Sequence, residues 1–383
     1  MTEFSTGAIA RASAALRTQF FVLGVMFATW GVHVPTVKAH YGLGEQSLAL
    51  AMLAGGVGAL MALAQAGRVV GRFGPATVAA VMGVLCCASV ASLLAFPVYG
   101  ALLVVMLGFG ITGSLMDVAI NVEASEIERQ SGRPLMSGFH GMFSLGGMMG
   151  AGLGSLAPTL GLSAQGHLFV ATGLGAVAAL VASRLMLPVP PGASQEKHPL
   201  SIPRGPLLLL GVLASMGLIA EGAMYDWSVL FMKEERGSGA STAALAYASF
   251  SGAMAAGRFG GDWVRARMSG TRLMRASGVL AAAGMALALS VPSPLVALLG
   301  FALVGLGLSN VVPVLFSAAA QVPGVSPAHG IASVSGVGYL GMMAGPPLIG
   351  LIAERSSLTA GLLVVVAFAV FMALSARRAM RGH

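Results

Sequence analysis

A carboxylate, Glu221, lies a little past the middle of an apolar stretch that runs from Leu207 to Phe231. At a rise of about 1.5 Å per residue, a helix of this length crosses a hydrocarbon layer roughly 30 Å thick. An ionisable side chain near the middle of a bilayer is costly and points to function. No Lys or Arg lies inside the same helix, and the basic residues of the other spans cluster at their ends, so no cation is expected beside Glu221. We therefore expect desolvation to favour the neutral carboxyl, so that Glu221 can carry a proton; the alternative is a hydrogen-bonded strut between helices.

Aromatic rings beside polar groups mark two candidate solute contacts. Tyr225, Asp226 and Trp227 follow Glu221 by about one turn, and Trp30 precedes His33 by three residues in the first apolar stretch. A ring and a polar group on one face suit stacking and hydrogen bonding to a sugar-like solute. The alternative for His33 is an interior histidine with satisfied hydrogen bonds.

Further polar groups lie inside the fourth, fifth and tenth apolar stretches. Asp117 and Asn121 share one helix face, and His140 lies at a similar depth in the next helix. We expect Asp117 and His140 to meet and to relay protons, since histidine titrates near neutral pH; the alternative is a structural hydrogen bond. Asn310, beside the repeat counterpart of Asp117 at Ser309, is a further candidate for solute binding.

The composition is that of a polytopic membrane protein. Of 383 residues, 56% are hydrophobic and only 9% are charged, with a mean hydropathy of +0.87, whereas soluble domains carry roughly 25% charged residues. The 54 glycines fit helices that pack closely in lipid. The net charge of +8 is scattered over the ends of apolar stretches, which argues against nucleic acid as a partner. No metal site and no cofactor is expected.

Twelve apolar stretches have the length of a membrane span. They are residues 18–39, 46–67, 76–96, 98–121, 135–157, 166–187, 207–231, 241–261, 273–291, 294–320, 331–353 and 358–376. The first is expected to be retained, since no small-residue cleavage site follows it. The proline-rich segment 188–206 reads as a cytoplasmic linker between a bundle at 1–187 and a bundle at 207–383.

Basic residues predict the orientation of the chain. With the amino terminus inside, 17 Lys and Arg residues lie on the cytoplasmic side and 4 lie outside. This bias indicates a bacterial inner (plasma) membrane protein with both termini in the cytoplasm.

Three short motifs recur in the same order in both halves. They begin at Gly67 and Gly257, at Leu107 and Leu299, and at Gly147 and Gly341, which are offsets of 190, 192 and 194 residues. The repeat predicts an all-α fold of twelve transmembrane helices in two pseudo-symmetric six-helix bundles. Parallel repeats of this kind place a solute site near the midplane, at the interface of the halves.

Glycine motifs inside the spans are interpreted as packing. The stretch from Gly108 to Gly113 fits a dinucleotide fingerprint, but no strand precedes it. Gly146, Gly150 and Gly154 form small-residue steps that favour close helix contact. The sequence has no Walker-type loop, so ATP is not expected to drive the protein through its own chain.

The segment from Gly67 to Pro75 resembles the loop motif that follows the second helix of the major facilitator superfamily. Gly67, Arg68 and Arg72 match the motif, while Gly71 stands in place of its acid and Pro75 in place of its final base. The second half keeps Gly257 and Arg258, with Asp262 one residue late. The resemblance implies the superfamily fold and a gating role for this set.

The first span and the segment Arg133–His140 resemble the fucose:proton symporter-like branch of the superfamily and its sugar-transporter-like members. The acid that such symporters carry in the first span falls at Gly31 by this spacing, and Gly31 corresponds to Glu221 under the offset of 190 residues. The resemblance suggests that the acid has moved to the second half.

Together these patterns predict a monomeric secondary transporter, not an enzyme, which moves a small solute by alternating access with protons. A sugar-like polar compound is the first choice. The 23 methionines keep efflux of amphipathic compounds open as an alternative. A membrane sensor or scaffold without transport is a third reading, disfavoured by the short loops.

Overall fold

The computed structural model describes residues 5–132, 135–187, 204–325 and 327–380, without the side chains of residues 262, 327, 328 and 332. Helices form the regular structure of this part of the chain. The expected linker at 188–206 lies outside the described residues except for its last three positions.

The chain divides into two compact units, and the first comprises residues 1–43 and 50–196. Its helices are α1 (Thr6–Tyr41), most of α2 (Glu45–Phe73), α3 (Pro75–Ala91), α4 (Tyr99–Ser131), α5 (Met136–Leu156), the short η1 (Pro158–Leu160) and α6 (Ala164–Ser183).

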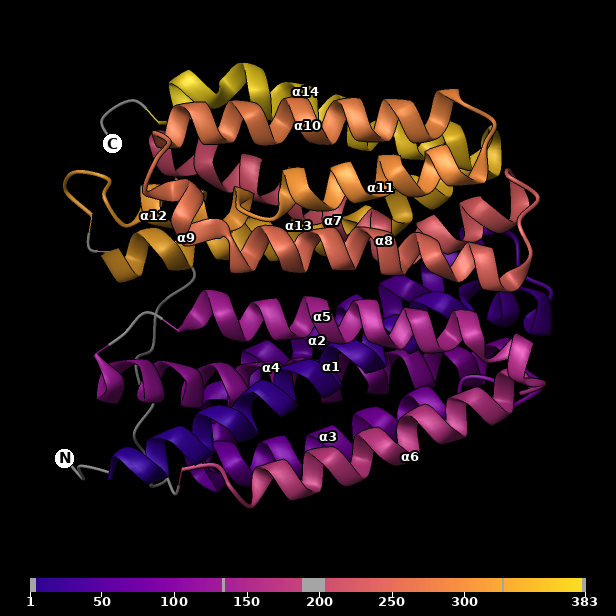
Figure 1. Ribbon diagram of the computed structural model, residues 1–383, viewed down its shortest axis with the longest axis horizontal. Helices are drawn as coiled ribbons and strands as arrows, with labels where there is room; N and C mark the ends of the chain where they lie inside the picture. The colour runs from indigo at the N-terminus through magenta and orange to yellow at the C-terminus, as the bar shows by residue number, and fades with distance from the viewer. Residues whose placement is uncertain (1–4, 133–134, 188–203, 326, 381–383) are drawn as a thin grey trace. The chain divides into compact units, whose positions relative to one another are not determined.

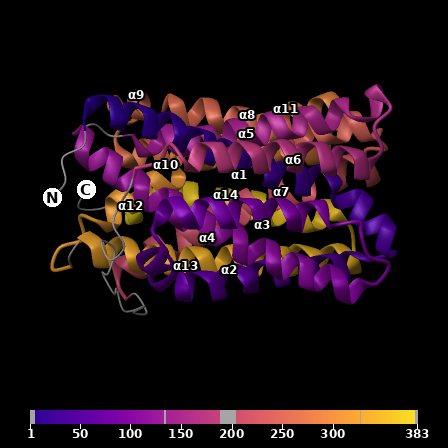
Figure 2. The same cartoon turned by 90° about the horizontal axis from the view of Figure 1, so that it is seen from below.

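Helix α1 is the centre of the first unit and packs along α5, α6, α4 and α3 (Figures 1 and 2). The Ser5 side chain caps its first turn by accepting from the Ala8 amide, and Gly42 ends it in the left-handed conformation with φ of 62°. Glycines allow the close approach of α5. A methyl group at Gly146 would overlap the Phe21 carbonyl oxygen, and one at Gly150 would lie 3.0 Å from the Ala28 methyl. The predicted packing role of these glycines is confirmed.

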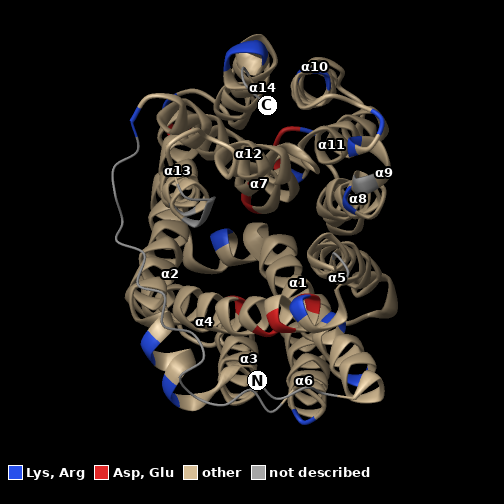
Figure 3. Ribbon diagram, turned by 90° about the vertical axis from the view of Figure 1, so that its left-hand side faces the viewer, with Lys and Arg blue, Asp and Glu red and all other residues tan. Residues whose placement is uncertain are grey.

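The second unit comprises residues 44–49 and 197–383. Its helices are α7 (Pro206–Glu234), α8 (Ala240–Phe259), α9 (Gly261–Arg265), α10 (Gly270–Ser290), α11 (Pro294–Leu308), α12 (Val311–Ala319), α13 (Pro327–Arg355) and α14 (Leu358–Ala379). Helix α7 lies in the middle of this unit, surrounded by α8, α11, α12, α13 and α14 (Figure 3).

The two units repeat one packing scheme. As α1 packs on α5 in the first unit, α7 packs on α13 in the second. Small residues again set the contact, because a methyl group at Gly341 would overlap the Ser215 side chain and one at Gly345 would lie 3.2 Å from Ile219 Cγ2. The predicted internal repeat is therefore visible in the helix contacts.

Eleven of the twelve predicted spans lie mainly on one helix each, the tenth lies on two, and the fold class is confirmed. With α11 and α12 taken together, nine helical segments of the described residues are long and apolar enough to cross a membrane, and α3 is a shorter apolar helix. Helices α5 and α8 are rich in glycine, alanine and serine and are not among these nine. Some helices also extend beyond the ends of the apolar stretches. Helix α1 begins twelve residues before the predicted span, and α4 continues ten residues beyond it.

The tenth span is divided, where one continuous helix was expected. Helix α11 ends at Leu308, Asn310 caps α12, and Pro313 occupies the first turn of α12. Proline lacks an amide hydrogen and cannot continue the hydrogen bonds of the preceding helix, so it is tolerated where a new helix starts.

Candidate functional site

Glu221 lies near the middle of α7, the central helix of the second unit. Its side chain is buried, and the residue is 8% exposed. Ala220, Gly222 and Ala223 flank it. Because these side chains are small, side chains of neighbouring helices can approach the carboxylate.

Arg258, near the end of α8, is the partner of this carboxylate. Its Nη2 atom donates to Glu221 Oε1 at 3.0 Å, and both side chains are mostly buried. The expectation that no cation lies near Glu221 is wrong. It rested on Arg258 lying at the end of its apolar stretch, but the guanidinium extends back along α8 into the interior of the unit.

Tyr225 completes a triad with these two side chains. Its hydroxyl donates to Glu221 Oε1 at 3.1 Å. The two residues are four positions apart on α7, so they lie on the same face of the helix, about one turn apart. The Arg258 guanidinium also hydrogen-bonds the Tyr225 side chain. An acid, a base and a phenol thus close a buried polar cluster in which the two formal charges cancel.

Aromatic rings of α8 cover the triad on one side. The Tyr225 ring lies 5.1 Å from the Tyr247 ring and 5.2 Å from the Phe250 ring, centroid to centroid. Tyr247 is fully buried, and its hydroxyl has no partner among the described residues. The sequence analysis missed Tyr247. Its spacing of eleven residues from Arg258, close to three helical turns, is the signal that places both on one face of α8.

Tyr225, Asp226 and Trp227 project in different directions from α7, and solute binding by the three residues stays a prediction. Successive helix residues project about 100° apart, so neighbours in sequence diverge in space. Tyr225 faces α8, whereas the Trp227 ring lies against Gly350 of α13. Trp227 is fully buried and Asp226 is half-buried. Tyr225 is the residue of this segment that hydrogen-bonds Glu221.

Asn310 holds the end of α8 beside Arg258. Its side-chain amide donates to the Gly257 carbonyl oxygen at 3.2 Å and to Ser309 Oγ at 3.0 Å. A methyl group at Gly257 would overlap the Ser309 hydroxyl. Asn310 therefore positions the helix that carries the guanidinium, and solute binding by Asn310 stays a prediction.

In the first unit, Asp117 has its hydrogen bond on its own helix. Asn121 Nδ2 donates to Asp117 Oδ1 at 3.1 Å and to the Asp117 carbonyl oxygen at 2.9 Å. The His140 ring packs edge-on against Phe20 of α1, with centroids 5.2 Å apart. The pairing of Asp117 with His140 stays a prediction, as do proton transfer by both residues and solute binding by Asn121.

His33 forms a histidine pair that the sequence analysis did not anticipate. Its Nε2 atom lies 2.9 Å from Nδ1 of His167 on α6, and both residues are buried. A neutral pair needs one ring nitrogen as donor and the other as acceptor. Trp30, which lies on α1 with His33, is also buried. Its role in solute binding, like that of His33, stays a prediction.

The motif expected in a loop after the second span lies on the last turns of α2, which continues to Phe73 before Gly74 turns the chain with φ of 77°. Arg68 donates to Gln65 at 2.8 Å, and the Arg72 guanidinium lies 5.4 Å from the Phe73 ring centre. A methyl group at Gly67 would have open space.

In the second half, Arg258 of the predicted gating set forms the buried ion pair instead of lying in a loop. The side chain of Asp262 and the residues Arg133 and Pro134 lie outside the described part of the chain. The gating role of the set stays a prediction.

Comparison with known proteins identifies the family. Residues 18–338 match the Major Facilitator Superfamily. An uncharacterized MFS-type transporter of Yersinia pestis is 36% identical over 369 residues, which are 95% of each chain. The membrane protein MosC of Rhizobium meliloti is 32% identical over 363 residues, covering 94% of this chain and 88% of MosC.

Among solved structures, a D-xylose–proton symporter aligns with a TM-score of 0.77 at 14% identity, covering 96% of this chain and 97% of the symporter, which is a similarity of fold. Family, relatives and helices agree with the resemblance seen in the sequence. The chain therefore belongs to the major facilitator superfamily and is a multi-pass membrane transporter.

Proposed function

We propose that the protein imports a small polar solute, of sugar-like chemistry, together with protons by alternating access. The observation that carries the proposal is the buried triad of Glu221 and Tyr225 on α7, the central helix of the second unit, with Arg258 on α8. The shared fold of a D-xylose–proton symporter supports this substrate class and coupling ion.

The ion pair supplies a way to couple a proton to movement. Removing one partner of a buried ion pair leaves an uncompensated charge, which costs roughly 3–5 kcal/mol. Protonation of Glu221 has the same effect on Arg258, since the guanidinium stays charged. The protonated state therefore favours an arrangement of α7 and α8 in which Arg258 finds water or another acceptor.

The same change frees groups that recognise hydroxyls. Once Glu221 is neutral, the Arg258 guanidinium and the Tyr225 hydroxyl lose their charged acceptor and become donors for a solute. The rings of Tyr225, Tyr247 and Phe250 supply an apolar surface beside these donors. Polar donors next to aromatic faces suit a sugar ring better than an acyl chain.

The proposed orientation has both termini in the cytoplasm and the protein in the bacterial inner membrane. The excess of Lys and Arg on one side supports it. The native cysteines, Cys86 and Cys87, are buried and can be replaced by alanine. A single cysteine placed at position 7 should then react with an impermeant maleimide only in inside-out vesicles.

The coupling test is uptake of labelled monosaccharides into proteoliposomes under an imposed pH gradient. Glu221→Gln keeps the volume and hydrogen bonding of the side chain but fixes the neutral state. We expect proton-driven accumulation to fall to background, while exchange of preloaded solute continues. The matched control is Glu126→Gln, because Glu126 belongs to the first unit and pairs there with Arg129 on the same helix.

Accumulation by Glu221→Gln at the wild-type level would contradict proton coupling by Glu221. Asp117 would then be the next candidate for the proton site. Export of amphipathic dyes without sugar uptake would contradict the substrate class and favour efflux. Absence of any solute movement would favour a sensor.

A further inference from the structure

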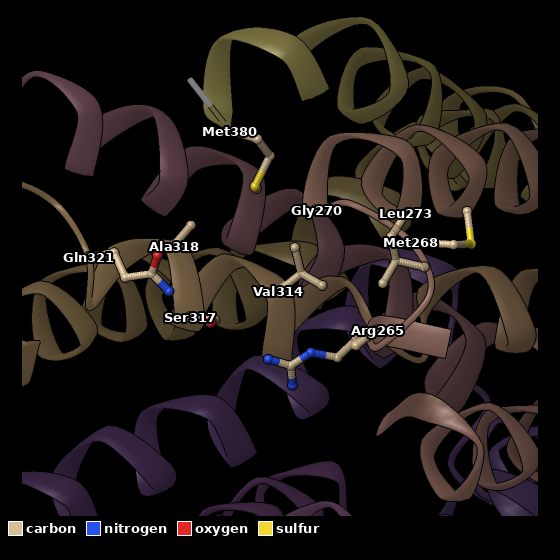
Figure 4. Close-up of a pocket in the computed structure, with 9 residues that line it drawn as sticks. All are labelled: Arg265, Met268, Gly270, Leu273, Val314, Ser317, Ala318, Gln321 and Met380. Atoms are coloured by element: carbon tan, nitrogen blue, oxygen red, sulfur yellow. The ribbon is translucent and has the colours of Figure 1, made fainter. Parts of the chain in front are cut away.

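A pocket of about 170 Å³ opens at one end of the second unit, away from the triad (Figure 4). Four helical elements form it: the end of α9, the start of α10, α12 and the end of α14. All of them belong to one unit, so the pocket is a property of that unit alone.

One side of the pocket is polar. Arg265, the last residue of α9, extends its guanidinium into the pocket, and Ser317 and Gln321 of the α12 region line the same space (Figure 4). Arg265 is the charged residue among the described side chains of the lining. A guanidinium beside a hydroxyl and an amide provides convergent donors for an oxyanion, and Arg matches the geometry of phosphate in particular.

The opposite side of the pocket is apolar. Met268, Leu273 and Met380 line it, and their flexible or branched side chains can pack against an alkyl chain (Figure 4). Gly270 keeps the pocket open between them, because a methyl group at this position would lie 3.3 Å from Met380 Sδ. A small inorganic anion would leave this apolar surface without a partner.

The surroundings have the character of a membrane surface. Trp263 is 63% exposed, and the Arg267 guanidinium lies 4.1 Å above its ring. Basic residues occupy the start of α10 and the end of α14, namely Arg272, Arg275, Arg377 and Arg378 (Figure 3). Exposed Trp beside clustered Arg is typical of the interface between lipid and water, and basic pockets between helices bind anionic head groups.

We propose that this pocket binds the phosphate group of an anionic phospholipid. Arg265, Ser317 and Gln321 hold the phosphate, and Met268, Leu273 and Met380 contact the glycerol end of an acyl chain. The shared chemistry is a phosphate ester, which a soluble metabolite can also supply. The apolar side of the pocket favours the lipid.

Native mass spectrometry of the full chain in detergent tests the proposal with added phosphatidylglycerol. Two variants distinguish the contribution of the positive charge from that of the pocket volume. Arg265→Gln removes the guanidinium, and Ser317→Phe fills the pocket without a change in charge. We expect both to weaken phosphatidylglycerol binding about tenfold, the loss typical of one charge-assisted contact. Arg267→Gln, on the same segment but outside the lining, is the control and should bind within about twofold of the wild type.

Three outcomes would overturn the proposal. Equal binding by the wild type and Arg265→Gln would show that no specific phosphate contact exists. Loss in Arg267→Gln equal to that in Arg265→Gln, with Ser317→Phe unchanged, would assign the binding to general surface charge. Displacement of phosphatidylglycerol by millimolar glycerol 3-phosphate would assign the pocket to a soluble phosphate ester. Unchanged melting temperatures of the lipid-free variants would confirm that each is folded.

Discussion

Arg258 Nη2 and Glu221 Oε1 lie 3.0 Å apart, although 37 residues separate them along the chain. We expect Arg258→Ala to lower the free energy of unfolding by about 3 kcal/mol or more, because it leaves the Glu221 carboxylate buried without its cation. In a Glu221→Gln background the same substitution should cost little or even raise stability, because it removes the Arg258 charge that Glu221→Gln has left buried without its partner.

Chemical denaturation in detergent measures this double-mutant cycle. Its readout is the coupling energy between the two positions. Additive effects, with a coupling energy near zero, would show that the pair adds nothing to stability.

The Tyr225 hydroxyl and ring contribute separately. Tyr225→Phe removes the hydrogen bond to Glu221 but keeps the ring contacts with Tyr247 and Phe250. We expect a loss of about 1–2 kcal/mol for Tyr225→Phe and about 3–5 kcal/mol for Tyr225→Ala, which also leaves a cavity. Thermal melting of both variants ranks them. Equal losses would assign the whole contribution to the hydroxyl and contradict the packing role of the ring.

Sequence reasoning located Glu221 but misjudged its surroundings. An apolar stretch indicates how deep a residue lies, because the rise per residue is fixed. It does not show how far a long side chain reaches from a neighbouring helix. Arg258 looked like an end-of-helix charge, yet the four-bond stem of arginine carries its guanidinium back into the unit. The partner of a buried charge is therefore the part of the site that only the three-dimensional structure reveals.

The histidine pair shows the same limit between distant segments. His33 and His167 lie 134 residues apart, and no local pattern relates them. By contrast, the repeat motifs and the glycine steps predicted the helix scheme well. Close helix contact in lipid requires small residues at regular spacing, and this spacing can be recognised within a single segment of the sequence.

The contact between His33 and His167 should stabilise the packing of α1 on α6. We expect His33→Phe and His167→Phe each to cost about 1–3 kcal/mol, since each leaves a buried ring nitrogen without its partner. The double variant should cost less than the sum of the single ones. His40→Phe is the control for an exposed histidine and should cost about 1 kcal/mol or less, the contribution of its hydrogen bond to the Phe96 carbonyl oxygen. Melting curves of the four proteins at one pH make the comparison. Strictly additive losses would contradict the pair.

Glycines at helix contacts should be far less tolerant than glycines elsewhere on the same helix. Gly146 and Gly152 both lie in α5, but a methyl group at Gly146 would overlap the Phe21 backbone, whereas Gly152 has no heavy atom within 4 Å of that position. Backbone atoms of α1 cannot move aside without separating the helices. We therefore expect Gly146→Ala to cost about 1–3 kcal/mol.

Gly152→Ala should be neutral or stabilise the protein by up to about 1 kcal/mol, because alanine restricts the unfolded chain. Gly341→Ala, at the contact of α7 with α13 in the second unit, should cost about as much as Gly146→Ala, because the added methyl group would lie within 3 Å of the Ser215 side chain and of its backbone Cα atom. Melting temperatures in one detergent rank the three variants. If Gly146→Ala and Gly152→Ala melted at the same temperature, close packing through α5 would not be what holds the first unit together.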